Sequence, residues 1–112
     1  MITLNDKIGY IRRDTIDGKE KFKFIESKVK SIYIGKKGTR VYTERFIPLD
    51  LEELESNTKY IIKDGKPTSI MLVSEAFITT DEYSEHCRKT VDYWNEHGAK
   101  SLLDDLTKGG AE

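Results

Sequence analysis

The sequence has a single cysteine, Cys87, so no disulfide can form within the chain. Long apolar runs are also missing, because no run approaches the roughly 18 residues that a membrane-spanning helix needs. The first residues, MITLNDK, lack the charged segment followed by an apolar segment that is typical of a signal peptide. We therefore expect a cytoplasmic protein with no membrane partner.

Residue spacings that indicate a metal site or a catalytic pair are lacking as well. His86 and Cys87 are adjacent and would point to different sides of a helix, and His97 follows ten residues later. Neither spacing matches a zinc motif. On one helix, Cys87 and His97 would lie nearly three turns apart, too far to act as nucleophile and base. The segment 35–38 is too short for a phosphate-binding loop. We expect a buried thiol, two surface imidazoles, no enzyme activity, no metal and no cofactor.

The 112 residues are 37% hydrophobic and 35% charged, which predicts one small globular domain with a heavily solvated surface. The formal net charge is only −1, but it is divided unevenly along the chain. Residues 1–49 carry a net charge of +6, and residues 50–112 carry −7. A basic half joined to an acidic half indicates a role in association, because clustered charge steers encounters between molecules.

The first half of the chain consists of β-rich segments separated by turn residues. We expect strands at residues 2–12, 21–34 and 39–46. Asp17-Gly18 predicts a turn, and the loop at 35–38 predicts a hairpin, because glycine readily adopts positive φ. The apolar alternation changes phase between Val29 and Ile32, which predicts a β-bulge that returns both side chains to the core.

Pro48 interrupts this pattern, and residues 50–54 predict no more than a short helical turn. Asp50 is the expected N-cap of that turn, with Glu53 at the capping-box position. Strands at 59–63 and 68–73 are expected to flank a turn at 64–67, and a short extended piece is expected at 76–78.

A helix is expected to begin at Thr79 or Thr80, since Thr79 and Glu82 fit a capping box. Its apolar residues recur at steps of four, four and three, which places them on one helical face. These residues are Tyr83, Cys87, Val91 and Trp94. Gly98 is the expected end, residues 101–106 could form a second short helix, and residues 109–112 read as a flexible tail.

These elements predict an α+β fold in one domain, with a mainly β part at 1–78 and a helical part at 79–108. A sheet this small closes most easily as a partly open, antiparallel, SH3-like barrel of about five strands. The C-terminal amphipathic helix would then lie across an opening or an edge of that barrel, which limits exposed strand edges.

Basic residues alternate with aromatic residues in the first half, as on small barrels that bind single-stranded nucleic acid. The expected contacts are Arg12, Arg13, Lys21, Lys23, Lys36, Lys37 and Arg40. The alternative is that the aromatic residues belong to the core and the lysines are simply solvated.

Acidic residues of the second half form the other candidate surface, which would meet a basic protein partner. The residues are Glu52, Glu53, Glu55, Glu82, Glu85, Asp92 and Glu96. The alternative is a solvated helix surface without a partner. The sequence leaves the oligomeric state open.

Residues 28–42 (KVKSIYIGKKGTRVY) and 76–83 (AFITTDEY) resemble small proteins of phages and mobile elements in Firmicutes. Those proteins combine a strand, a Lys-Lys-Gly hairpin and a second strand with a late entry into a C-terminal helix. The segment 48–58 and the residues after Gly98 depart from this pattern. The resemblance implies an SH3-like barrel with a helix and an accessory role.

Such a role could be that of an anti-defence, anti-CRISPR-like protein. From charge and resemblance together, we expect a non-enzymatic protein-binding module that inhibits a host nucleic-acid enzyme. The alternative is a small-barrel protein that binds nucleic acid through its basic N-terminal strands.

Overall fold

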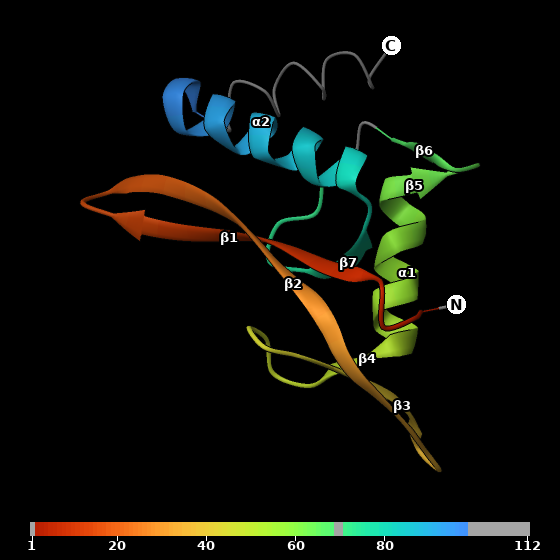
Figure 1. Ribbon diagram of the computed structural model, residues 1–112. Helices are drawn as coiled ribbons and strands as arrows, with labels where there is room; N and C mark the ends of the chain where they lie inside the picture. The colour runs from red at the N-terminus through yellow and green to blue at the C-terminus, as the bar shows by residue number, and fades with distance from the viewer. Residues whose placement is uncertain (1, 69–70, 99–112) are drawn as a thin grey trace.

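A five-stranded antiparallel sheet and two helices form the fold of the computed structural model, which describes residues 2–68 and 71–98 (Figure 1). The elements are β1 (Lys7–Ile16), β2 (Lys19–Gly35), β3 (Gly38–Thr43), β4 (Leu49–Asp50), α1 (Leu51–Ile61), β5 (Ile62–Lys63), β6 (Lys66–Pro67), β7 (Ala76–Thr79) and α2 (Asp81–His97). The strand order is β4-β3-β2-β1-β7, and β5 and β6 form a separate two-stranded sheet. The predicted α+β class is confirmed. Within the described residues the sheet is open, because its edge strands β4 and β7 do not pair with each other.

Two predicted turns are confirmed by the register of the hairpins. Ile16 pairs with Lys19 around Asp17 and Gly18, whose φ angles are 51° and 77°. Positive φ at both central residues gives a turn whose twist suits a two-residue hairpin loop. Gly35 pairs with Gly38, so the Lys-Lys pair forms the tip of the β2–β3 hairpin as expected.

The predicted β-bulge is also confirmed, since the β2–β3 register shifts between Val29 and Ser31. Val29 and Ile32 consequently both pack in the cluster that contains Val41. The first strand begins later than expected, at Lys7, because Thr3 and Asp6 close a turn before it. In that turn the Asp6 carboxylate accepts a hydrogen bond from the Thr3 N–H group at 2.7 Å.

The segment after Pro48 corrects three predictions. Residues 51–61 form an eleven-residue helix rather than a short turn, and the strand expected at 59–63 is mostly the end of this helix. The strand expected at 68–73 is wrong for the residues of that range that the structure describes, 68 and 71–73, none of which lies in a strand. The pairing found nearby joins β5 to β6 around Asp64 and Gly65. The predicted N-cap is confirmed, because the Asp50 carboxylate accepts the Glu53 N–H at 3.2 Å.

Side chains of α1 explain why its pattern is hard to read from the sequence. Asn57 donates to the Ala76 carbonyl at 2.8 Å, and the Thr58 hydroxyl accepts the Ile78 N–H at 2.9 Å. These bonds satisfy backbone groups along β7, an edge strand that would otherwise be open to pairing with another chain. Two residues that look like exposed polar positions therefore face the sheet.

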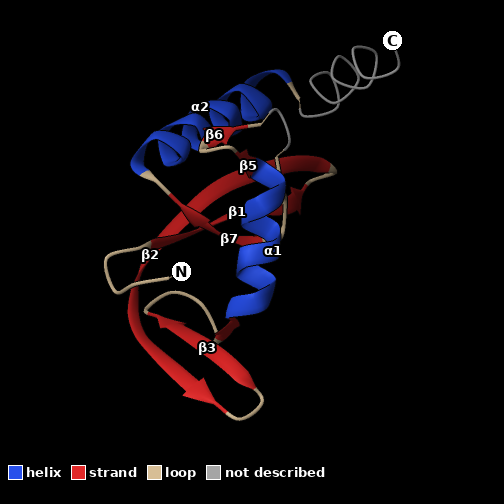
Figure 2. Cartoon of the chain, turned by 90° about the vertical axis from the view of Figure 1, so that its right-hand side faces the viewer, coloured by secondary structure: helices blue, strands red, loops and turns tan. Residues whose placement is uncertain are grey.

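The core is divided between the two faces of the sheet. The cluster under α2 contains Ile11, Phe22, Ile61, Phe77, Tyr83, Cys87, Val91 and Trp94. The cluster on the other face contains Ile2, Ile8, Val29, Val41 and Leu54. α1 contributes Leu54 to one cluster and Ile61 to the other, because it runs along the β7 edge between the two faces (Figure 2).

The predicted buried face of the C-terminal helix is confirmed, since all four of its residues are buried. The cap is Thr80, whose hydroxyl accepts the Tyr83 N–H at 3.2 Å. Thr79 is not the cap, because it is buried and shares a 3.1 Å hydrogen bond with Ser84. Gly98 ends α2 with a φ of 91°, as expected. The helix expected at 101–106 and the tail at 109–112 lie outside the described residues.

Candidate functional site

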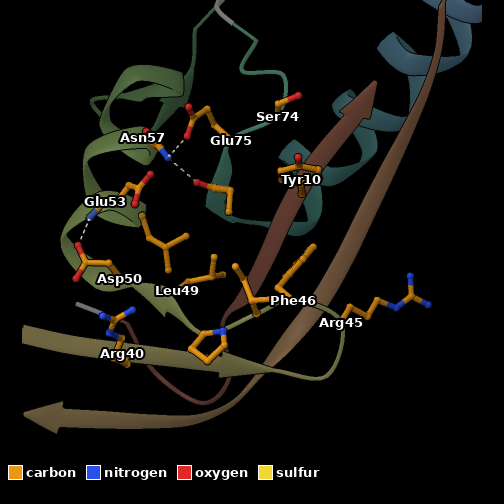
Figure 3. A pocket seen from close by; sticks show the side chains of 14 residues that line it. Tyr10, Arg40, Arg45, Phe46, Leu49, Asp50, Glu53, Asn57, Ser74 and Glu75 are labelled. Carbon is orange, nitrogen blue, oxygen red and sulfur yellow. Dashed lines mark hydrogen bonds between the residues drawn. The ribbon is translucent and has the colours of Figure 1, made fainter. Parts of the chain in front are cut away.

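A cavity of about 460 Å³ opens between α1, β1, the loop before β4 and the segment before β7 (Figure 3). Its apolar wall includes Leu49, Leu54 and Ala76. Tyr10 of β1 and Phe46 of the loop form a second, aromatic wall, with ring centroids 6.0 Å apart. The loop is held in place because the Phe46 N–H donates to the Thr43 hydroxyl at 3.0 Å.

Carboxylates line the side of this cavity that is next to α1. Glu75 accepts a long hydrogen bond of 3.5 Å from Asn57, whose amide is mainly engaged with the β7 backbone. The Glu53 carboxylate has no hydrogen bond or ion pair with any described residue, although it lines the same cavity. Asp50 also lines the cavity, but its carboxylate caps α1. Within the described part of the chain, the negatively charged carboxylates of Glu53 and Glu75 are therefore left without a cationic partner.

Sequence reasoning singled out Glu53 and Arg40, but as members of two different surfaces, and it missed the rest of this site. Its residues come from β1, from β3, from residues 45–50, from α1 and from residues 74–76. No local spacing connects these segments, so only their packing brings them together.

The structure does not bring the seven predicted basic residues together. Cross-strand pairing places Arg12 opposite Lys23, and it places Lys21 opposite Asp14 on the same side of the β1–β2 hairpin. Arg12 forms an ion pair with Asp14 at 2.8 Å, and Arg13 lies 3.9 Å from Glu20 on the other side. This first basic group is therefore partly neutralised.

The second basic group lies at the β2–β3 hairpin, whose tip is far from the β1–β2 tip (Figure 1). Lys36 and Lys37 form that tip, and Arg40 lies directly opposite Tyr33. Tyr42 is diagonal to Tyr33 on the same side, which faces away from the buried Val41. Tyr33 is 62% exposed and Tyr42 is 37% exposed, so both rings are accessible.

Gly35 sets the position of the Tyr33 ring. A Cβ atom at residue 35 would lie only 2.9 Å from Tyr33 Cε1, so the ring lies directly against the glycine backbone. The hairpin tip thus presents an aromatic ring beside two lysines.

The predicted acidic residues are divided between two helices. Glu52 and Glu53 are exposed in the first turn of α1, and Glu55 is half-buried. The other four, Glu82, Glu85, Asp92 and Glu96, are exposed on α2. Steps of three, seven and four residues place these four on one side of a helix. Glu85 has weak ion pairs, at 3.8 Å with Arg88 and 4.0 Å with Lys89.

Cys87 is fully buried, and this burial raises the pKa of its thiol to about 12. A thiol that stays protonated at neutral pH is a poor nucleophile. Both histidines are exposed, and His97 stacks on Tyr93 with ring centroids 4.4 Å apart. Among the described residues, no group of three or more His, Cys, Asp or Glu side chains could hold a metal ion.

Glu26 is the centre of a polar cluster that ties α2 to the sheet. It accepts a hydrogen bond from Ser84, and Arg88 and Lys7 lie 3.2 Å and 3.8 Å from its carboxylate. Lys7 also forms an ion pair with Asp81, and this hydrogen bond raises the pKa of Lys7. The charged groups of this cluster are therefore paired with one another, and their role is to hold α2 on the sheet.

Comparisons of the chain with protein-family models, curated proteins and solved structures find no match. Neither described helix has the length and apolar character that crossing a membrane requires.

Proposed function

We propose that the chain is a non-enzymatic protein-binding module that presents the outer side of α2 to a basic surface on its partner. The observation that carries this proposal is the row of exposed carboxylates formed by Glu82, Glu85, Asp92 and Glu96. The opposite side of α2 is buried on the sheet, which leaves the acidic side facing solvent along about 21 Å of helix. Complementary charge of this kind favours fast and specific association.

The partner class follows from the charge of the surface. A protein groove that holds nucleic-acid phosphates is rich in lysine and arginine, so a row of carboxylates can occupy it. We therefore propose a host or element-encoded nucleic-acid enzyme as the partner, with inhibition as the outcome. An anti-defence role and a kinship with SH3-like accessory proteins of Firmicutes phages belong to the same proposal, supported by the resemblance of residues 28–42 and 76–83.

Neutralising the α2 carboxylates is the direct test. The variant Glu82→Gln, Glu85→Gln, Asp92→Asn, Glu96→Gln is expected to bind its partner at least about tenfold more weakly at low salt, because several charge pairs are lost together. The partner is first isolated on the immobilised protein from a lysate of the organism that encodes the chain. Affinity is then measured by calorimetry at two salt concentrations.

The matched control neutralises two acidic residues of α1 that do not line the cavity, as Glu52→Gln, Glu55→Gln. It removes half as much charge and is expected to bind with at most a small loss. Unchanged binding by the α2 variant, or an equal loss in the α1 variant, would contradict the proposal.

A second candidate function is binding of single-stranded nucleic acid at the β2–β3 hairpin. It is favoured by the exposed Tyr33 and Tyr42 rings beside Arg40 and the two tip lysines. Aromatic side chains stack on successive bases, and nearby cations contact the phosphates. The first basic group does not support this function equally, because Arg12 is already paired with Asp14.

Fluorescence anisotropy with labelled oligothymidylate and with a labelled duplex tests this second function. The variant Tyr33→Ala, Tyr42→Ala is expected to bind the single strand at least about tenfold more weakly, whereas Tyr93→Ala is expected to bind like the wild type. Absence of single-strand binding by the wild type at about 50 mM salt would rule the function out.

A further inference from the structure

We infer that the cavity between α1 and the Tyr10–Phe46 wall binds an arginine side chain of a protein partner. The source of that arginine rests on the proposed protein-binding function, whereas the recognition of a guanidinium group rests on the cavity alone.

The size and walls of the cavity suit a long side chain. A volume of about 460 Å³ lies within the roughly 300–1,000 Å³ that is usual for ligand sites. Leu49, Leu54 and Ala76 offer apolar surface to the methylene groups of an arginine. Ile47, at the cavity, is 80% exposed and offers apolar surface to the partner backbone around that arginine.

The charged groups select a cation. Among the described residues, Glu53 has no hydrogen-bond or ion-pair partner, and Glu75 has only the long contact with Asn57. Figure 3 shows both glutamates on the α1 side of the cavity, on either side of Asn57. A guanidinium group donates from several N–H groups in one plane, so it can bind two carboxylates at once.

The aromatic wall favours arginine over lysine. Tyr10 and Phe46 both line the cavity, and their ring planes are inclined at 53° to each other. A guanidinium group stacks on aromatic rings more readily than a strongly hydrated ammonium group does.

Two arginines also line the cavity, but their positions leave its acidic side open. Figure 3 shows Arg45 extending away from the two glutamates and Arg40 lying next to Asp50. Neither arginine forms an ion pair with Glu53 or Glu75 in the described residues. An incoming cation therefore does not have to displace an arginine of the chain from these two carboxylates.

The test uses the full chain, labelled with ¹⁵N, and N-acetyl-arginine N-methylamide as a probe of peptide arginine. The probe is expected to shift the backbone amide signals of Phe46, Asn57 and Ala76 in a saturable manner. The matched probe is N-acetyl-citrulline N-methylamide, which has nearly the same shape but no charge. It is expected to bind at least about tenfold more weakly, because its neutral urea group cannot form an ion pair with the carboxylates.

Two variants of equal charge change locate the site. The variant Glu53→Gln, Glu75→Gln is expected to bind the arginine probe at least about tenfold more weakly. The control Glu52→Gln, Glu55→Gln is expected to leave its affinity unchanged. All four positions are exposed or half-buried, so these replacements are expected to leave the fold intact. The comparison of the arginine and citrulline probes uses the wild-type chain and does not depend on any variant.

Equal binding of the arginine and citrulline probes, or signal changes away from the cavity, would overturn the inference. The variant with four α2 carboxylates neutralised is expected to bind the arginine probe like the wild type. If this variant loses binding to the partner but still binds the arginine probe, the result bears only on the proposed function. If a variant loses binding to the probe but still binds the partner, the result bears only on the cavity.

Discussion

Replacing Trp94 with alanine is expected to lower the free energy of unfolding by about 3–5 kcal/mol, the usual cost of deleting a large buried aromatic side chain. Trp94 is only 3% exposed, and its ring meets Phe22 edge-on with centroids 5.0 Å apart. The next residue, Asn95, forms two 2.8 Å hydrogen bonds with the backbone of Phe22. Side-chain packing and edge hydrogen bonds thus hold α2 on β2 at one place.

Denaturant unfolding followed by far-UV circular dichroism measures this loss, and Tyr93→Ala is the matched control. Tyr93 is the preceding residue of the same helix but is 44% exposed, so its replacement is expected to cost less than about 1 kcal/mol. A loss of less than about 1 kcal/mol for Trp94→Ala would show that Trp94 does not anchor α2.

A phenylalanine at this position offers a finer test. The Trp94 indole N–H is buried and has no hydrogen-bond partner among the described residues. An unpaired buried donor is costly, so Trp94→Phe removes an unfavourable group as well as ring volume. It is therefore expected to cost clearly less than Trp94→Ala.

The second large effect is expected at Gly9, in the middle of β1. Gly9→Ala is expected to destabilise the protein by about 1–3 kcal/mol, the range for overpacking a core. An added Cβ would lie 2.9 Å from Phe77 Cε2 and 3.0 Å from Phe24 Cε1. Those two rings stack across the glycine with centroids 6.5 Å apart. The sign of the change in stability is informative, because a glycine within a strand normally destabilises a protein by about 0.5–1 kcal/mol relative to alanine.

A double-mutant cycle with Phe24→Leu identifies the cause. If the cost comes from contact with the Phe24 ring, Gly9→Ala is expected to cost less in the Phe24→Leu background than in the wild type. An increase in stability on Gly9→Ala in the wild-type background would contradict the packing argument.

The features that the sequence predicts correctly are those that depend on residues close together in the chain. The turn at Asp17-Gly18, the bulge after Val29 and the buried face of α2 depend on neighbours within a few residues, and these predictions are confirmed. The length of α1 was predicted wrongly, because Asn57 and Thr58 bind backbone groups of β7, about 20 residues away in the chain.

The candidate sites show the same division. Counting charges along the chain predicts acidic and basic surfaces, but it cannot say which residues share a surface. Pairing between strands divides the seven basic residues into two distant groups, and the ion pair of Arg12 with Asp14 on the same strand neutralises part of one group. Neither Tyr10 nor Glu75 has a neighbour in the sequence that marks it as part of a cavity.

The sequence by itself determined the α+β class, the hairpin tips, the bulge and the acidic side of α2, because each follows from residue spacing within one element. Only the tertiary structure decided that the sheet stays open, that α1 covers its β7 edge, and that a cavity forms beside Glu53. These features arise where segments distant in the chain pack together, and local residue preferences carry no information about which segments will meet.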